Sequence, residues 1–353
     1  MGGRFANRAT KQQKLMARAN LRIGIIGFPH NSGLGTMTME FCRYFPGTKA
    51  LLIDNGRYKS FPDRFPGARL SQRFTKDDLD WLLCDIDLLV TFETPIEWRA
   101  FAMAAARGIK TVLIPMYECM PQRWPALPDL ILCPSRLDYT IFHAEFNKLC
   151  KVEYLQWPVN REKVPFNPRK TAKVFEHHAG HGGLVGRNGT AELLAAIPML
   201  KSDAQIVIYS QREMHYTHPK LTLRVGNYAN YWDIWGSGDV FVFPHKFDGL
   251  SLPVQEALSN GMPVLSTEIP PFIGWLPQDW FFGAAELLQA KVFDRMVDIA
   301  LPDPAVIAAK IDAWYGTDIS EASRVANKLA AAIDWEVQGE KLNACFKRLC
   351  VTS

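Results

Sequence analysis

The sequence of 353 residues is long for one hydrophobic core, because single cores stop growing at roughly 250 to 300 residues, so we expect two domains. Its composition, with 48% hydrophobic and 22% charged residues, excludes a disordered or fibrous protein. The net charge of +4 is uneven: residues 1–150 hold 20 Lys/Arg and 14 Asp/Glu, a net +6, and residues 151–353 hold 20 and 22, a net −2.

The chain opens with a basic segment. Residues 1–20 contain no acidic side chain, and we expect them to form an arm that contacts an anionic surface, with a solvated tail as the alternative. No apolar signal region and no run of 18 apolar residues is found, so we expect a cytoplasmic protein without a transmembrane segment. The basic residues up to the first expected strand are Arg4, Arg8, Lys11, Lys14, Arg18 and Arg22.

The N-terminal half alternates short apolar runs with amphipathic stretches. Residues 21–28 (LRIGIIGF) end in Gly, Pro and Asn and precede a helical pattern at residues 36–44, which indicates strand, loop and helix. This alternation predicts a parallel, doubly wound α/β domain over residues 21–160. Further strands are expected at residues 50–53, 87–92, 111–115 and 130–133, with helices at 77–83 and 97–107.

The alternation restarts after a linker at residues 157–171, which carries three prolines and four Lys/Arg. We expect a second Rossmann-like domain over residues 172–330 and a C-terminal helix over residues 331–353 that packs back on the body. Strands are expected at residues 206–209, 222–225, 240–244 and 263–266, helices at 190–200 and 254–259, and an apolar face on the last helix from Trp335, Val337, Leu342, Phe346 and Leu349.

The most informative stretch is residues 243–272, FPHKFDGLSLPVQEALSNGMPVLSTEIPPF. Asp248 and Glu256 lie eight residues apart, one before and one inside a helix expected to begin near Pro253. Backbone amides of Gly249 and Ser251 at that helix N-terminus suit a diphosphate. Glu256 can accept both hydroxyls of a ribose, and Asp248 is placed to bind hydroxyls of a transferred sugar.

This stretch resembles the donor-binding segment of the retaining glycosyltransferases of glycosyltransferase-B fold often called family 4 or group 1. The resemblance implies two Rossmann-like domains facing across a cleft, with the donor held mainly by the C-terminal one. The sequence departs from the family pattern in having Asp248 for a Glu, Ser251 for a Gly, and His245-Lys246 for a Ser. The matching residues are Asp248, Gly249, Leu250, Ser251, Leu252, Pro253, Glu256, Ala257, Gly261, Pro263 and Val264.

A second block, residues 173–195 (KVFEHHAGHGGLVGRNGTAELLA), resembles the family's first donor-domain strand and loop. Arg187 matches a basic position that meets the phosphates, where a guanidinium neutralises the leaving diphosphate. We expect His178 to contact the donor as well. A zinc site on His177, His178 and His181 is the alternative, but no helix or carboxylate partner supports it.

A third block, residues 27–38 (GFPHNSGLGTMT), contains Gly33 and Gly35 but has Thr38 where a dinucleotide fingerprint needs a third glycine. With Asp54 as a ribose-binding acid it would imitate an NAD site, an alternative that leaves the C-terminal match unexplained. In the resembling family this loop reaches across the cleft to the donor. The resemblance also places Gly226 and Asn227 in the turn that binds the nucleobase.

Two acidic residues follow expected strand ends that face the cleft. Glu93 and Glu118 could each bind or deprotonate an acceptor hydroxyl, and a surface carboxylate is the alternative for each. We take Glu118, together with Arg187, Asp248 and Glu256, as the candidate catalytic set.

The function expected from these features is transfer of a sugar from a nucleoside-diphosphate sugar to an acceptor, with retained anomeric configuration as the family implies. No Asp-x-Asp metal motif is visible in residues 172–330, the expected donor domain, so no cofactor and no required divalent metal are expected. The basic N-terminal half suggests an anionic acceptor: a nucleic acid, an envelope glycan or a membrane surface. The alternatives are a sugar-nucleotide epimerase or hydrolase of the same fold, and a non-catalytic nucleic-acid-binding protein.

Overall fold

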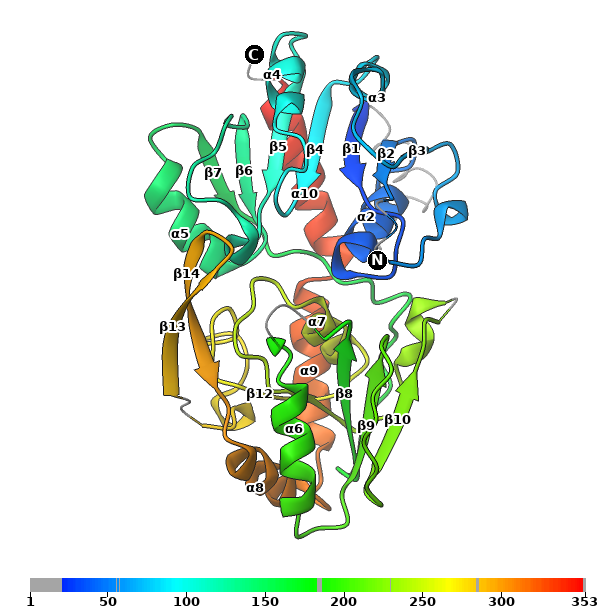
Figure 1. Cartoon of the computed structure of the whole chain (residues 1–353), viewed down its shortest axis with the longest axis vertical. Coiled ribbons are helices and arrows are strands. Elements are labelled where there is room, and N and C mark those ends of the chain that lie inside the picture. Colours follow the sequence, from blue (N-terminus) through cyan, green and yellow to red (C-terminus); the bar gives the residue numbers. More distant parts are fainter. Residues whose placement is uncertain are drawn as a thin grey trace, which may run out of the picture.

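The computed structural model describes residues 21–54, 56, 58–182, 186–228, 230–283 and 286–351. The expected basic arm, residues 1–20, lies outside the described residues. The described chain forms two α/β lobes stacked along the long axis of the molecule (Figure 1). We call the lobe built on the first sheet the N-terminal lobe and the lobe built on the second sheet the C-terminal lobe.

The N-terminal lobe has a seven-stranded parallel sheet in the order β3-β2-β1-β4-β5-β6-β7. Its interior strand β1 is buried along its whole length, as its uninterrupted apolar sequence predicts. The doubly wound fold expected here is confirmed. The strands are β1 (Ile23–Gly27), β2 (Lys49–Ile53), β3 (Arg69–Ser71), β4 (Leu88–Phe92), β5 (Lys110–Ile114), β6 (Leu130–Cys133) and β7 (Lys151–Tyr154). The helices are α2 (Gly33–Tyr44), η1 (Pro62–Arg64), α3 (Lys76–Leu82), α4 (Arg99–Ala105), η2 (Tyr117–Cys119) and α5 (Arg136–Phe146).

The C-terminal lobe repeats this architecture with a five-stranded parallel sheet in the order β10-β9-β8-β11-β12. The strand order of each sheet reverses beside its first strand, which places a crevice at the carboxyl ends of the strands. The strands are β8 (Val174–Gly180), β9 (Gln205–Ser210), β10 (Leu221–Val225), β11 (Val240–Phe243) and β12 (Val264–Ser266). The helices are α6 (Thr190–Ala196), η4 (Ile197–Met199), η5 (Tyr231–Ile234), α7 (Leu252–Ser259), η6 (Gln278–Trp280), α8 (Pro304–Trp314) and α9 (Ser320–Ala332).

The last helix, α10 (Trp335–Val351), crosses back and packs on the N-terminal lobe (Figure 1). Its buried side chains, among them Leu342 and Phe346, join the core cluster that contains Phe41. Val337, expected on this face, is instead 43% exposed. The helical pattern at the C-terminus is divided into two helices, α9 and α10. Between them, the backbone of the linker residue Val159 forms hydrogen bonds with the carbonyl of Ile333 and the amide of Trp335.

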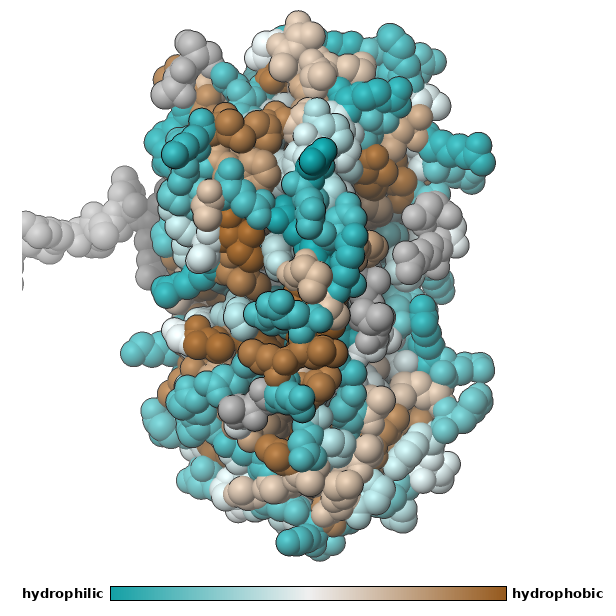
Figure 2. Space-filling model, turned by 60° about the vertical axis from the view of Figure 1, so that its left-hand side comes forward, coloured by the Kyte–Doolittle hydropathy of each residue, from teal (hydrophilic) through white to brown (hydrophobic). Residues whose placement is uncertain are grey.

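Several elements were not predicted, and one pair of them departs from the parallel α/β pattern. An antiparallel hairpin, β13 (Glu286–Val292) and β14 (Arg295–Leu301), rises along one side of the C-terminal lobe, and its tip lies beside α5 of the N-terminal lobe (Figure 1, orange). It carries exposed apolar side chains, including Leu287, Leu288 and Phe293. Figure 2, in which this side comes forward, shows apolar surface at mid-height of the molecule. Among the helices of the described residues, none has both the length and the apolar character needed to cross a membrane.

Candidate functional site

A cavity of about 310 Å³ lies between the two lobes. It is lined by the loop after β1, the segment after β5, and the carboxyl ends of β8, β9, β10 and β11. The crevices of both parallel sheets therefore open into one space, which is where ligands bind in open α/β sheets.

One end of the cavity is charged. Arg187 comes from the C-terminal lobe, and its Nη1 lies 3.0 Å from Oε1 of Glu118, which comes from η2 of the N-terminal lobe. Burial alone would raise the pKa of Asp248, but the charge of Arg187 and a hydrogen bond from His245 outweigh it and lower that pKa to about 2. Arg187 thus lies between carboxyl groups that come from opposite lobes.

The two candidate acceptor-side carboxyl groups differ in position. Glu118 lines the cavity, whereas Glu93 lies behind it and accepts a hydrogen bond from the Cys119 thiol at 3.2 Å. Burial raises the pKa of Glu118 and that of Glu93, although Arg187 opposes the shift in both. Burial therefore opposes the charged form of both carboxyl groups, and the charge of Arg187 favours it.

Asp248 is held by two neighbours. His245 Nδ1 lies 2.7 Å from its Oδ2, and the Ser251 hydroxyl donates to the same oxygen at 2.5 Å. Ser251 has a φ of 55°, in the left-handed region that glycine adopts freely, and the resembling family has glycine at this position. A serine is strained in this conformation, and strain of this kind clusters at functional sites. The Ser251 hydroxyl in turn fixes the Asp248 carboxylate.

Gly249 leaves room for the contact between the lobes. A Cβ atom at Gly249 would lie 2.6 Å from Oε2 of Glu118, closer than carbon and oxygen can approach. We predict that Gly249→Ala folds but displaces Glu118 from Arg187, and lowers turnover about 10-fold with a smaller effect on nucleotide binding. Steady-state kinetics and calorimetric titration with UDP and ADP measure both. Unchanged turnover would show that the Glu118 position is not needed.

Glu256 lies deeper than the sequence suggested. It is 3% exposed and does not line the cavity, and its Oε2 accepts a hydrogen bond at 2.5 Å from Tyr231, which does line it. Burial raises the pKa of Glu256 to about 8, although the Tyr231 hydrogen bond opposes the shift. A ligand that uses the Glu256 carboxylate must therefore move or share Tyr231.

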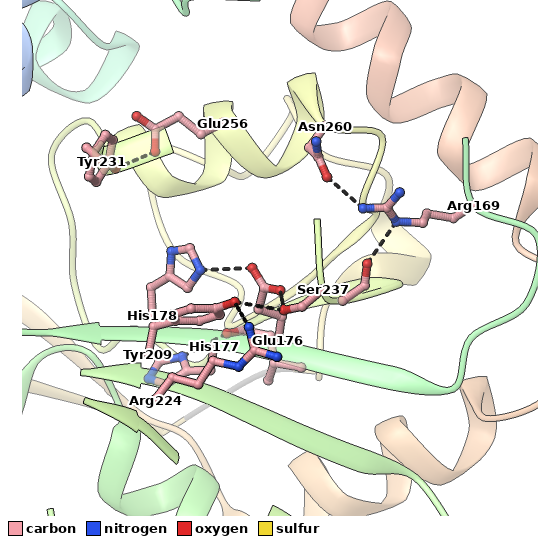
Figure 3. Close-up of polar contacts among 12 residues, drawn as sticks. Arg169, Glu176, His177, His178, Tyr209, Arg224, Tyr231, Ser237, Glu256 and Asn260 are labelled. Atoms are coloured by element: carbon pink, nitrogen blue, oxygen red, sulfur yellow. Dashed lines mark hydrogen bonds and ion pairs between the residues drawn. The ribbon is translucent and has the colours of Figure 1, made fainter. Parts of the chain in front are cut away.

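The other end of the cavity is aromatic. His178 Nε2 lies 2.9 Å from Glu176, and the Glu176 carboxyl accepts a second hydrogen bond from Ser237, which also bonds Tyr209 (Figure 3). Glu176 is fully buried in β8, so this series of hydrogen bonds fixes the orientation of the His178 ring. The ring packs against Trp235 at a centroid distance of 4.3 Å. Such a lining of flat side chains suits a flat ring with polar edges.

Three buried polar atoms of residues that line this cavity have no hydrogen-bond partner among the described residues. They are Glu118 Oε2, Arg187 Nε and His178 Nδ1. Buried polar atoms are nearly always paired in folded proteins, and although such unpaired atoms also occur elsewhere in the described residues, these three belong to residues that a ligand in the cavity contacts. The cavity thus offers a cation, a carboxyl group and an imidazole to a polar ligand.

Most of the predicted donor-binding residues reach the cavity. Gly35 does not line it, because its Cα packs on the backbone of His30, where an added Cβ would lie 1.7 Å from the carbonyl oxygen. Asp54, the acid of the NAD alternative, does not line it either, and bonds the backbone of Gly56. The predicted residues that line it are Gly33, Glu118, His178, Arg187, Gly226, Asn227, Asp248, Leu250, Ser251 and Leu252.

The zinc alternative has no support in the geometry. Both ring nitrogens of His177 are engaged inside the lobe, Nδ1 with the Val242 carbonyl at 2.9 Å and Nε2 with Thr190 at 2.8 Å. Burial lowers the pKa of His177 to about 3, so the ring is neutral. No cluster of His, Cys, Asp and Glu within the described ranges could hold a metal ion.

Sequence reasoning missed several lining residues. Tyr209 is the second-last residue of β9 and Tyr228 lies in the loop after β10, so their positions near the carboxyl ends of strands are the signal that could have found them. Tyr231 and Ile234 belong to the short helix η5, whose sequence shows no periodicity that marks a binding surface.

We compared the chain with protein-family models, curated protein sequences and solved structures. No protein-family model and no curated protein sequence matches the chain. Among solved structures, a glycosyltransferase from Rickettsia africae is 12% identical over 95% of this chain and 100% of that one, with a TM-score of 0.70. Anabaena HepE in complex with UDP-glucose is 11% identical over 93% and 100%, with a TM-score of 0.65. Sucrose-phosphate synthase from Thermosynechococcus elongatus is 11% identical over 94% and 100%, with a TM-score of 0.64.

At these identities the likeness establishes the fold. The chain has the glycosyltransferase-B fold, with two parallel-sheet α/β domains, as the resemblance implied.

Proposed function

We propose that the protein is a glycosyltransferase that moves a sugar from a nucleoside-diphosphate sugar to an acceptor hydroxyl, with retention of the anomeric configuration. The observation that carries this proposal is the set of unpaired buried atoms, Glu118 Oε2, Arg187 Nε and His178 Nδ1, around one cavity between two nucleotide-type domains. A nucleotide sugar has a diphosphate for the cation, a flat base for the aromatic end and hydroxyls for the carboxyl groups.

The proposed donor spans the cavity. The base lies among Tyr209, Tyr228 and His178, and the diphosphate lies between Arg187 and the N-terminus of α7. Asp248, ionised because its pKa is about 2, accepts hydrogen bonds from hydroxyls of the transferred sugar. The transferred sugar is then held between the two lobes, on the side where Glu118 enters.

Arg187 and Glu118 take separate roles when the donor is bound. The diphosphate competes with Glu118 for the guanidinium, which neutralises the charge that develops on the leaving group as the glycosidic bond breaks. Glu118, released from Arg187, binds the acceptor hydroxyl and takes its proton. Arg187 and the backbone amides at the N-terminus of α7 stabilise the negative charge of the leaving diphosphate. We therefore propose that no divalent metal is required.

The experiment that tests this function measures release of nucleoside diphosphate. UDP-, ADP- and GDP-sugars are incubated with the protein, with and without a panel of neutral glycans, anionic glycans and nucleic acids, in the presence of EDTA. We expect one donor to turn over, faster when its acceptor is present. Equal release with and without every acceptor would favour a hydrolase instead, and conversion of the donor to an isomeric nucleotide sugar without release would favour an epimerase.

The acceptor is proposed to be anionic, a nucleic acid or an acidic glycan or membrane surface. Residues 1–20 hold five Lys/Arg and no Asp/Glu, so they supply five of the six net positive charges of residues 1–150. We predict that removing residues 1–20 weakens acceptor binding and reduces its salt dependence, whereas donor hydrolysis without acceptor is unchanged. Titration over 50 to 200 mM salt, roughly the range in which such binding changes most, measures this.

The control for this deletion is the full chain assayed in the same salt series. If the truncated protein transfers sugar at the same rate as the full chain from low to moderate salt, the arm is a solvated tail and the anionic acceptor loses its main support.

A further inference from the structure

The β13–β14 hairpin contacts the loop that carries Asp248. The backbone amide of Ala300 donates to the carbonyl of Lys246 at 2.7 Å, and Val292 and Val297 pack on the buried ring of Phe247. Lys246 and Phe247 immediately precede Asp248 in the chain. The hairpin is therefore attached to the donor side of the cavity.

The other end of the hairpin enters the N-terminal lobe through Arg295. The side chain of Arg295 is only 7% exposed. Its Nε donates to the carbonyl of Met120 at 3.2 Å and its Nη2 to that of Pro121 at 3.1 Å. Its Nη1 and Nη2 also form a two-pronged ion pair with the Glu145 carboxylate, at 2.6 and 3.1 Å. Met120 and Pro121 directly follow η2, the helix that carries Glu118.

Burial of this guanidinium is informative because a buried cation is unfavourable unless its donors are satisfied. The four hydrogen bonds of Arg295 use four of its five N–H donors. The guanidinium also lies over the ring of Tyr117, 5.5 Å from its centroid, and the Tyr117 hydroxyl donates to the Met296 carbonyl. The hairpin thus contacts the Glu118 segment at the first residue of η2, Tyr117, and directly after its last residue, at Met120 and Pro121.

The N-terminal lobe holds the same segment by contacts of its own. The Tyr117 amide donates to Asp138 at 2.8 Å, and Thr94 donates to the Cys119 carbonyl. These bonds keep η2 folded within its lobe, but they leave its distance from the donor lobe open. Together with the ion pair between Glu118 and Arg187, the contacts from the hairpin join η2 to the side of Asp248.

We infer that the hairpin is a clasp between the lobes and that Arg295 is a positioning residue, which holds the Glu118 carboxyl opposite Arg187 and Asp248. Arg295 does not line the cavity, so it acts through Glu118. The inference rests on the proposed function for its kinetic readout, and it has a second readout, the shape of the molecule, that does not depend on any reaction.

The kinetic experiment is a double-mutant cycle between Arg295→Met and Glu118→Gln. Methionine keeps the apolar stem of Arg295 and removes its hydrogen bonds. We expect Arg295→Met to lower turnover at least about 10-fold while the affinity for UDP or ADP changes by less than about 3-fold. In the Glu118→Gln background the same substitution should have no further effect. An equal fall in both backgrounds would overturn the positioning role.

Two further variants separate positioning from general destabilisation. Arg295→Lys keeps the charge but cannot form the forked contact, so we expect it to restore part of the lost turnover. Lys291→Ala is the matched control on the same hairpin, since Lys291 is 63% exposed and its ion pair with Asp294 is 3.6 Å long. It should match the wild type.

The shape experiment compares small-angle scattering of the free proteins. We expect a larger radius of gyration for Arg295→Met than for the wild type or Lys291→Ala, because the lobes separate when the clasp is lost. If Arg295→Met does not fold, Glu145→Gln, which weakens the same ion pair from the other lobe, replaces it. If the wild type releases nucleotide from no donor, the proposed function fails, and scattering alone decides: unchanged profiles in the clasp variants overturn this inference.

Discussion

Arg187→Ala should lower turnover of the donor by about 100- to 1,000-fold, the loss seen when a preorganised charge-stabilising group is removed. The affinity for the nucleoside diphosphate should fall much less, because the charge on the leaving group peaks in the transition state. Arg187 is suited to this role because it is the cation that the cavity places between Glu118 and Asp248. Steady-state kinetics and calorimetric titration give the two quantities separately.

The control for Arg187→Ala is Arg324→Ala, which removes an arginine that is 66% exposed and pairs with Glu321 on the surface of α9. It should leave both quantities unchanged. Equal losses of turnover and affinity in Arg187→Ala would mean that this residue only binds the diphosphate.

Glu256→Ala should weaken donor binding by on the order of 3 kcal/mol, since a buried carboxylate that accepts two ribose hydroxyls is lost. The wild-type affinity should also rise with pH. Burial raises the pKa of Glu256 to about 8 in the free protein, and the ionised form is the one that accepts both hydroxyls. Between pH 7 and 9 the ionised fraction grows, so binding should strengthen by up to about 10-fold.

Titrations with a nucleotide sugar at several pH values test this prediction. Glu256→Gln has no carboxyl proton to lose, so its affinity should not follow this pH dependence. Tyr231→Phe removes the hydroxyl that bonds Glu256 and opposes the rise in the Glu256 pKa, so the pH dependence of its donor affinity should shift to higher pH than in the wild type. Wild-type affinity in Glu256→Ala would exclude the ribose-binding role.

The parts of the fold that could be predicted from the sequence are those with local signals. Strands such as β1 are uninterrupted apolar runs between turn residues, and the spacing of Asp248 and Glu256 around the start of α7 is a local property. The hairpin was missed because β13 is exposed along most of its length, so its sequence lacks the alternation that marks a half-buried strand.

The arrangement of the site depends on contacts that no local pattern carries. Glu118 and Arg187 are 69 residues apart and come from different lobes, so their ion pair could not be predicted from either segment. The same holds for the hydrogen bond from Tyr231 to Glu256. The Glu256 carboxyl group is buried there, although it was expected to face the ligand. Sequence spacing identified candidate residues, whereas their burial and pairing depend on how the two lobes meet.

The most direct test of the central claim, that a nucleotide sugar binds in the cavity between the lobes, is a crystal structure with the donor that turns over fastest. We predict that the diphosphate lies within hydrogen-bonding distance of Arg187 and the N-terminus of α7, with the ribose near Glu256 and the sugar against Asp248. A donor bound elsewhere, or bound in the cavity with its diphosphate away from Arg187, would contradict this account.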